Sequence, residues 1–134
     1  MEWNDVVPHL TGLAHVATTD ADGHPAVAVV SPIVEDGTIW FQTRASSQKA
    51  RNLVADRGIA LMWQPGGEVY VWGEADVIAD AAVKARLWPT WNYDAVSFFG
   101  APDDPGVVVV RVTPTRATVL TGGEPGPQRQ RWTR

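Results

Sequence analysis

Alternation of apolar and polar residues is the main pattern along this chain, and it predicts strands. The clearest example runs from residue 68 to residue 78, where a period of two is typical of a strand with one buried face. One side of this strand carries Val69, Val71, Gly73, Ala75 and Val77. Shorter apolar runs predict further strands at residues 13–18, 26–34, 38–43, 59–63, 107–112 and 115–120.

Turn residues separate these runs. The sequence Asp20-Ala21-Asp22-Gly23 lies between two of them, and its glycine supplies the positive φ that a tight hairpin turn requires. Residues 35–37 and 65–67 carry similar turn signals. We therefore expect a meander of three strands before residue 45 and a further turn at residues 65–67.

Helices are expected where the period changes. Residues 2–9 predict a short helix weakened by Pro8, and residues 46–55 predict a polar helix with a serine as its N-cap. In the second helix, Ala50, Leu53 and Val54 are expected to pack against the strands. A third helix is expected from a cap at Asp80 to about residue 88, and residues 89–106 form an ordered loop rich in proline and aromatic residues.

Six or seven strands with two or three short helices indicate a mainly β fold, a closed or nearly closed antiparallel barrel. The length of 134 residues fits one domain, which we expect to span residues 1–121. Residues 122–134 are expected to form a basic Gly/Pro tail that is mobile unless a partner holds it.

Composition narrows the function classes. The chain has no cysteine, which excludes thiolate zinc sites and cysteine nucleophiles. It has no apolar run long enough to span a membrane, and its first residues are acidic, so we expect a cytoplasmic protein without a membrane partner. The last thirteen residues carry three arginines and one glutamate, a net charge of +2. Since the whole chain has a net charge of −4, the preceding residues have a net charge of −6. We therefore expect no nucleic-acid partner.

Three segments carry a family resemblance. Residues 41–53 read Phe-Gln-Thr-Arg-Ala-Ser-Ser-Gln-Lys-Ala-Arg-Asn-Leu, a strand ending in threonine that runs into Ser-x-Lys at the start of a helix. Residues 98–105 read Phe-Phe-Gly-Ala-Pro-Asp-Asp-Pro, and residues 22–25 read Asp-Gly-His-Pro. These motifs resemble the pyridoxamine 5′-phosphate oxidase superfamily, in particular its general stress protein branch, over residues 13–120. The resemblance implies the FMN-binding split β-barrel fold.

The resemblance also implies a flavin site. Free backbone N–H groups and the positive end of the dipole at a helix N-terminus suit a phosphate, and Lys49 adds a full charge there. Family members are homodimers with the flavin between subunits, so aromatic side chains of a partner are expected to complete the pocket. The residues expected to contact the cofactor are Val29, Val30, Ser31, Gln42, Thr43, Arg44, Ser46, Ser47, Gln48, Lys49, Arg51, Trp88, Trp91 and Phe98.

The sequence departs from the family pattern in two places. The family's oxidases carry a phosphate-binding arginine on the second strand, but the matching position near Ala28 has no charge. Arg44 or Arg51 is the expected replacement. The C-terminal arginine and histidine pattern that holds pyridoxal phosphate is missing as well, so oxidation of vitamin B6 is not expected.

Three functions remain open at this point. The first is an FMN-dependent oxidoreductase that passes electrons to a small-molecule substrate, with no indispensable protein acid or base. The second is a reductase that uses the deazaflavin coenzyme F-420 on the same fold. The third is a non-catalytic flavin-binding protein of the stress response.

Other residues that could take part in chemistry are expected to have structural roles. Trp40, Trp63 and Trp72 are expected to pack in the barrel or an interface, and the three histidines lack metal-ligand spacing, so no metal site is expected. Asp103 and Asp104 stand between prolines, which favours a turn. The sequence offers neither a Ser-His-Asp arrangement nor a GxGxxG loop.

Overall fold

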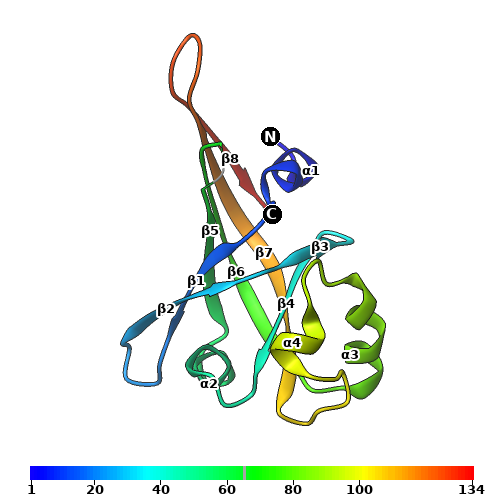
Figure 1. Ribbon diagram of the computed structural model, residues 1–134. Coiled ribbons are helices and arrows are strands. Elements are labelled where there is room, and N and C mark those ends of the chain that lie inside the picture. The colour runs from blue at the N-terminus through cyan, green and yellow to red at the C-terminus, as the bar shows by residue number, and fades with distance from the viewer. Residues whose placement is uncertain (65) are drawn as a thin grey trace.

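The computed structural model describes residues 1–64 and 66–134, and in these residues eight antiparallel strands form one sheet. The strand order is β2-β1-β5-β6-β7-β4-β3, and β8 also pairs with β7 (Figure 1). The strands are β1 (Ala14–Thr19), β2 (Pro25–Val30), β3 (Ile33–Glu35), β4 (Thr38–Arg44), β5 (Gly58–Trp63), β6 (Glu68–Ile78), β7 (Val107–Thr121) and β8 (Gln128–Thr133). The helices are α1 (Trp3–Val6), α2 (Gln48–Ala55), α3 (Ala81–Leu87) and α4 (Ala95–Phe99), with 3₁₀ turns η1 (Val7–His9) and η2 (Trp88–Thr90). This architecture confirms the predicted mainly β split barrel.

The barrel is split between β2 and β4. The sequence predicts one strand over residues 26–34, but this strand is interrupted at Ser31 and Pro32, because proline has no N–H for a strand ladder. The part before the break pairs with β1, and the part after it pairs with β4. The expected three-strand meander is therefore two hairpins at opposite ends of the strand order. Among the described residues β2 and β4 share no hydrogen-bonded register, which leaves a seam between them.

The C-terminal strands differ from the sequence prediction. Residues 107–112 and 115–120, expected as two strands, form the single strand β7, and a register shift opposite Trp72 and Gly73 accommodates Pro114. The expected mobile tail is wrong as well, because β8 pairs with β7 along residues 116–121. Trp132 is the one large apolar residue of β8, and its ring lies 4.8 Å from that of Trp3.

The main core fills the inner face of the sheet. Alternate residues of four adjacent strands point inward, and four of them, one from each strand, are at most 2% exposed: Val16, Leu61, Val71 and Ala117. The predicted alternation along β6 is thereby confirmed. A second cluster lies under α3 and α4, and it consists of Trp40, Leu87, Trp91, Ala95 and Val109. Trp40 and Trp63 are buried as expected, whereas Trp72 is only half-buried.

Helix α2 lies at the end of the barrel away from the β7–β8 hairpin (Figure 1). Ser47 is its N-cap, as predicted, and the Ser47 hydroxyl accepts a hydrogen bond from the backbone N–H of Ala50. The expected apolar face is only partly right, because Val54 is exposed. Asn52 is buried instead, where its side-chain amide donates to the hydroxyl of Thr18 at 3.0 Å.

The segment between β6 and β7 is more helical than expected. Asp80 caps α3, as predicted, but the 3₁₀ turn η2 and the helix α4 at residues 95–99 were not predicted. Lys84 is buried at 5% exposure, and its ammonium donates to the backbone carbonyls of Asp104 and Val107 at 3.0 and 2.9 Å. This contact ties α3 to the turn that precedes β7. No helix of the described chain is long and apolar enough to cross a membrane.

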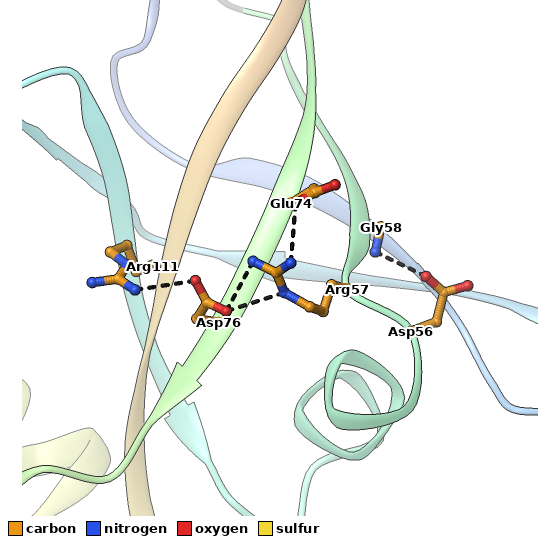
Figure 2. Close-up of polar contacts among 6 residues, drawn as sticks. All are labelled: Asp56, Arg57, Gly58, Glu74, Asp76 and Arg111. Atoms are coloured by element: carbon orange, nitrogen blue, oxygen red, sulfur yellow. Dashed lines mark hydrogen bonds and ion pairs between the residues drawn. The ribbon is translucent and has the colours of Figure 1, made fainter.

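An ion network crosses the sheet beside this segment (Figure 2). The Arg57 guanidinium bridges Glu74 and Asp76, each at 3.0 Å, and Arg111 contacts the second oxygen of Asp76 at 3.1 Å. The hydrogen bond from Arg111 is the largest cause of a lowered pKa for Asp76. All four side chains are a third or more exposed, so we regard the network as a modest link between the residue before β5 and the strands β6 and β7.

Candidate functional site

A pocket of about 260 Å³ opens at the seam of the barrel. Residues at the ends of β2 and β4 form two of its walls, α2 contributes Lys49, and the segment around α4 forms the remaining wall. Its lining residues are Leu13, Val29, Val30, Ser31, Gln42, Thr43, Lys49, Tyr93, Phe98 and Phe99. The pocket exists because β2 and β4 diverge instead of pairing.

The structure brings half of the predicted site residues together here. Those that line the pocket are Val29, Val30, Ser31, Gln42, Thr43, Lys49 and Phe98. Those that do not line it are Arg44, Ser46, Ser47, Gln48, Arg51, Trp88 and Trp91. Leu13, Tyr93 and Phe99 line it without having been predicted. The concentration of aromatic residues between 91 and 99 was the available signal for Tyr93 and Phe99.

Lys49 is the cation of this pocket. It lies in the first turn of α2 and is half-buried, and this burial lowers the pKa of its ammonium. Within the described residues, Lys49 forms no ion pair with a carboxylate. A half-buried positive charge without an acidic partner favours an anionic ligand in the pocket.

Hydroxyl groups stand next to Lys49. Thr43 donates its hydroxyl to that of Ser47 at 3.1 Å, and the Ser47 hydroxyl also accepts from the N–H of Ala50. Both acceptor positions of Ser47 are then occupied, so its own proton is left to donate. Ser46 is exposed, and the side-chain amide of Gln48 donates to Asn52 at 2.7 Å.

Neither arginine expected to replace the missing strand arginine lines the pocket. The Arg44 guanidinium donates to the backbone carbonyl of Phe98 at 3.0 Å and lies 5.8 Å from the centroid of the Phe99 ring. Arg51 is exposed and donates to the side chain of Gln48 at 2.9 Å. Arg44 therefore holds the wall formed by α4, and Lys49 is the one cation among the described lining residues.

Tyr93 and Gln42 form the polar pair of the pocket. The Gln42 amide donates to the Tyr93 hydroxyl at 2.6 Å. Burial raises the pKa of Tyr93 to about 12, although the bond from Gln42 opposes the shift. Tyr93 is therefore a neutral phenol at physiological pH and a hydrogen-bond donor, unsuited to act as a base. Its ring is held edge-on by Phe98 and Phe99, at 5.8 and 6.3 Å between centroids.

The two predicted tryptophans have a packing role in this chain. Trp91 is 7% exposed and belongs to the second core cluster, and Trp88 packs against the same cluster. Their side chains are taken up by Leu87, Trp40 and their neighbours, so they are poor candidates for reaching the pocket of a partner. The tertiary burial of residues 88–91 was not visible in the sequence.

One polar cluster lies away from the pocket, in the β1–β2 turn. Asp20 accepts hydrogen bonds from the backbone N–H groups of Asp22 and His24, each at 2.9 Å. The bond from His24 is the main cause of a lowered pKa for Asp20. Side-chain atoms of Asp20, Asp22 and His24 lie within 4.8 Å of one another, a grouping that the histidine spacing did not reveal. The backbone bonds explain this arrangement as turn geometry.

The family model described as pyridoxamine 5′-phosphate oxidase matches residues 7–121. A sequence search of curated proteins found no match.

Solved structures resemble the chain over most of its length. General stress protein 26 from Bacillus anthracis str. Sterne is 18% identical with a TM-score of 0.70, and 95% of each chain is covered. A pyridoxamine 5′-phosphate oxidase-related, FMN-binding protein from Nostoc punctiforme is 19% identical with a TM-score of 0.69, covering 98% of this chain and 87% of that one. A protein named F420 reductase is 21% identical with a TM-score of 0.66, covering 85% of this chain and 94% of that one. At these identities the likeness concerns the fold.

Proposed function

Because the chain belongs to the pyridoxamine 5′-phosphate oxidase family, whose model spans residues 7–121, we propose that its seam pocket binds FMN and that the protein is a flavin-dependent oxidoreductase. General stress protein 26 and an FMN-binding protein are among its structural relatives, which supports a flavin as the ligand class. FMN would supply the electron transfer, and the chain would bind and orient it.

The observation that carries this proposal is the half-buried, unpaired charge of Lys49 at the start of α2. A phosphate placed in the pocket would meet the ammonium of Lys49 and the positive end of the helix dipole, while Ser47 caps the helix outside the pocket lining. Thr43 at the end of β4 lies beside the same position, since its hydroxyl contacts Ser47. These groups would offer a phosphate monoester one positive charge and hydrogen-bond donors.

The rest of the pocket suits a planar ring. Phe98, Phe99 and Val30 provide apolar surface, while Gln42 and Tyr93 offer hydrogen bonds at one place. Small-molecule sites combine apolar walls with few polar groups in this way. Tyr93, which stays protonated at neutral pH, would donate a hydrogen bond to the ring system and could not remove a proton from a substrate.

A deazaflavin reductase is the second candidate. One cation lines the described pocket, which is a weak complement for an FMN phosphate dianion, and an F420 reductase is among the structural relatives. The same ring-binding wall would accept a deazaflavin.

We further propose that the chain acts as a homodimer with the cofactor at the subunit interface, in the cytoplasm. Three residues that line the pocket are largely exposed, namely Leu13 at 62%, Val29 at 55% and Phe98 at 64%. The pocket volume of about 260 Å³ lies below the roughly 300–1,000 Å³ of typical small-molecule sites. Apolar, open walls of this kind favour a second protein surface that covers the ligand.

A titration of the purified chain with FMN, riboflavin and the deazaflavin coenzyme tests these proposals. Riboflavin lacks the phosphate, so FMN should bind more tightly. Lys49→Ala should weaken FMN binding by about 1.5–3 kcal/mol, the contribution of a hydrogen bond to a charged group, or roughly 10- to 150-fold. The same substitution should leave riboflavin binding nearly unchanged.

Arg51→Ala is the matched control, because Arg51 lies in the same helix but contacts Gln48 outside the pocket. Equal affinities for FMN and riboflavin, or an unchanged FMN affinity in Lys49→Ala, would exclude the phosphate site. Tight binding of the deazaflavin alone would select the second candidate. Binding of FMN without turnover by any reductant would indicate the non-catalytic role.

A further inference from the structure

Strand β8 forms an edge of the sheet, in a hairpin that projects from the end of the barrel opposite α2 (Figure 1). In the described part of the chain, β8 pairs with β7 alone. The backbone N–H of Arg134 donates to the carbonyl of Thr115 at 2.9 Å, and this bond identifies which residues of the two strands form hydrogen-bonded pairs. Such pairs alternate along an antiparallel ladder, so the backbone groups of residues 128, 130 and 132 point toward β7.

The other edge of β8 carries the backbone groups of Arg129, Arg131 and Thr133. Their N–H and C=O groups point away from β7, and no backbone hydrogen bond within the described residues uses them. All three residues are exposed. An unpaired strand edge can accept an extended peptide as an additional strand, whose main chain then continues the ladder. The edge of β8 is therefore a place where another polypeptide can bind.

Positive charge follows this edge. The side chains of Arg129 and Arg131 lie on one face of β8, two residues apart, and Arg116 of β7 lies on the same face. Together with Tyr70 and Trp72, the three arginines line a hollow of about 400 Å³. Within the described residues, none of the three guanidinium groups forms an ion pair. This uncompensated positive charge favours an acidic ligand at the edge.

A nucleic acid is a poor occupant of this edge, because the aromatic surface beside it is already covered. The Arg116 guanidinium lies 4.0 Å from the centroid of the Trp72 ring, and the Tyr70 ring stacks on that of Trp72 at 6.1 Å. The Tyr70 hydroxyl donates to the carboxylate of Glu68 at 2.7 Å, which puts a negative charge beside the hollow. The bases of a single strand need open aromatic faces and a cationic groove. A nucleic-acid backbone also offers no alternating N–H and C=O groups to bond a strand edge.

A second copy of the chain fits the edge no better. Two β8 edges paired about a two-fold axis would bring the arginines of both copies together. Like charges directly opposite each other destabilise a pair of strands. The chemistry of the edge therefore selects a polypeptide of opposite charge.

We propose that the free edge of β8 binds an extended acidic segment of another protein as an additional antiparallel strand. The antiparallel direction continues the pairing found throughout the described sheet. Peptide residues bonded to Arg129 and Arg131 would be two positions apart and would share the face of the arginines. Glutamate or aspartate at both positions would place a carboxylate beside each guanidinium, which can bind it through two parallel hydrogen bonds. The residue between them would lie on the face of Trp132 and should be apolar.

Anisotropy of a fluorescent peptide of three Glu-Val repeats measures binding to the full chain, without any cofactor. The peptide should bind, and added salt should weaken the binding because exposed charges are screened. The double variant Arg129→Gln with Arg131→Gln should bind it more weakly by about 10-fold or more. Arg51→Gln, a change of an exposed arginine in α2, is the control and should leave the affinity unchanged. Absence of binding to the natural chain, or full binding to the double variant, would overturn the proposal.

Reversal of the charges separates the loss of a specific contact from a loss of folding. Arg129→Glu with Arg131→Glu should reject the glutamate peptide and bind a peptide of three Lys-Val repeats, which the natural chain should reject. A variant that binds the lysine peptide has kept β8 in place. Binding of both peptides by both chains would indicate a non-specific apolar contact and would refute the role of the arginines.

Methylation of the peptide backbone tests strand addition itself. In the antiparallel pair the glutamate N–H groups would face β8, and the valine N–H groups would face solvent. N-methylation of the glutamates should therefore abolish binding, whereas N-methylation of the valines should preserve it. Equal effects of the two would indicate attraction by charge alone and would contradict an added strand. Stronger competition by a thymidine oligonucleotide than by the unlabelled peptide would identify a nucleic acid as the ligand instead.

Discussion

Lys84 is a buried cation whose removal should be measurable in stability. Its ammonium donates to the carbonyls of Asp104 and Val107, and no carboxylate of the described chain pairs with it. The substitution Lys84→Met keeps a long unbranched side chain in α3 but removes both hydrogen bonds. The two carbonyls would then lose this donor at a place that water hardly reaches, since Lys84 itself is only 5% exposed.

The expected loss follows from the two bonds. Hydrogen bonds that involve a charged group contribute about 1.5–3 kcal/mol each, so two of them contribute roughly 3–6 kcal/mol. Methionine avoids the desolvation of an ammonium, which offsets about 1–3 kcal/mol of that sum. Subtracting the midpoints of these ranges, about 4.5 and about 2 kcal/mol, we expect Lys84→Met to lower the free energy of unfolding by about 2.5 kcal/mol.

Urea unfolding followed by tryptophan fluorescence measures this loss. The midpoint should fall while the slope with denaturant stays the same, as expected when stability changes and the unfolded state does not. Lys49→Ala is the control lysine, and its half-buried position predicts a change within about 0.5 kcal/mol. A loss below about 0.5 kcal/mol in Lys84→Met would refute the view that this contact secures the turn before β7.

Three other perturbations have defined outcomes. Gly73→Ala should cost about 1–3 kcal/mol in a thermal melt, because its Cβ would lie 2.3 Å from the carbonyl oxygen of Thr113. FMN affinity should fall as pH rises through the pKa of Lys49, which burial lowers from 10.5, and Lys49→Ala should remove this fall. The hydrogen bond from Arg111 lowers the pKa of Asp76 below 3.8 in the folded protein. The carboxylate therefore stabilises the fold fully above pH 3.8, and this stabilisation is lost as the pH falls through the lower pKa of the folded state. Urea midpoints between about pH 5 and pH 2 should show a smaller acid loss for Asp76→Asn.

The sequence predicted the features that depend on local pattern. The alternation along β6, the caps Ser47 and Asp80 and the turn after Asp20 are confirmed because neighbouring residues determine them. The motif around Lys49, which joins the end of β4 to the start of α2, contributes Thr43 and Lys49 to the lining of the pocket.

The errors arise where distant contacts override local pattern. Residues 107–112 and 115–120 were predicted as two strands, but the register shift opposite Gly73 lets β7 continue through both. The sequence Gln-Arg-Gln-Arg before Trp132 has no apolar alternation, so pairing with β7 alone identifies β8. Trp91 and Tyr93 are equally aromatic, yet Trp91 packs into the second core cluster and Tyr93 faces the pocket. The packing of the surrounding helices, which the local pattern does not show, determines which of the two side chains is buried in the core.

The helical segment between β6 and β7 leaves and rejoins the sheet at adjacent points, because Ile78 pairs with Val109. Changes of length in such an excursion cost little loop-closure entropy and leave the strand registers intact. Since this excursion supplies Tyr93, Phe98 and Phe99 to the pocket, ligand preference can diverge during evolution without redesign of the barrel. Protein engineers can likewise replace residues 88–106 as one segment while Lys84 and the strands stay unchanged.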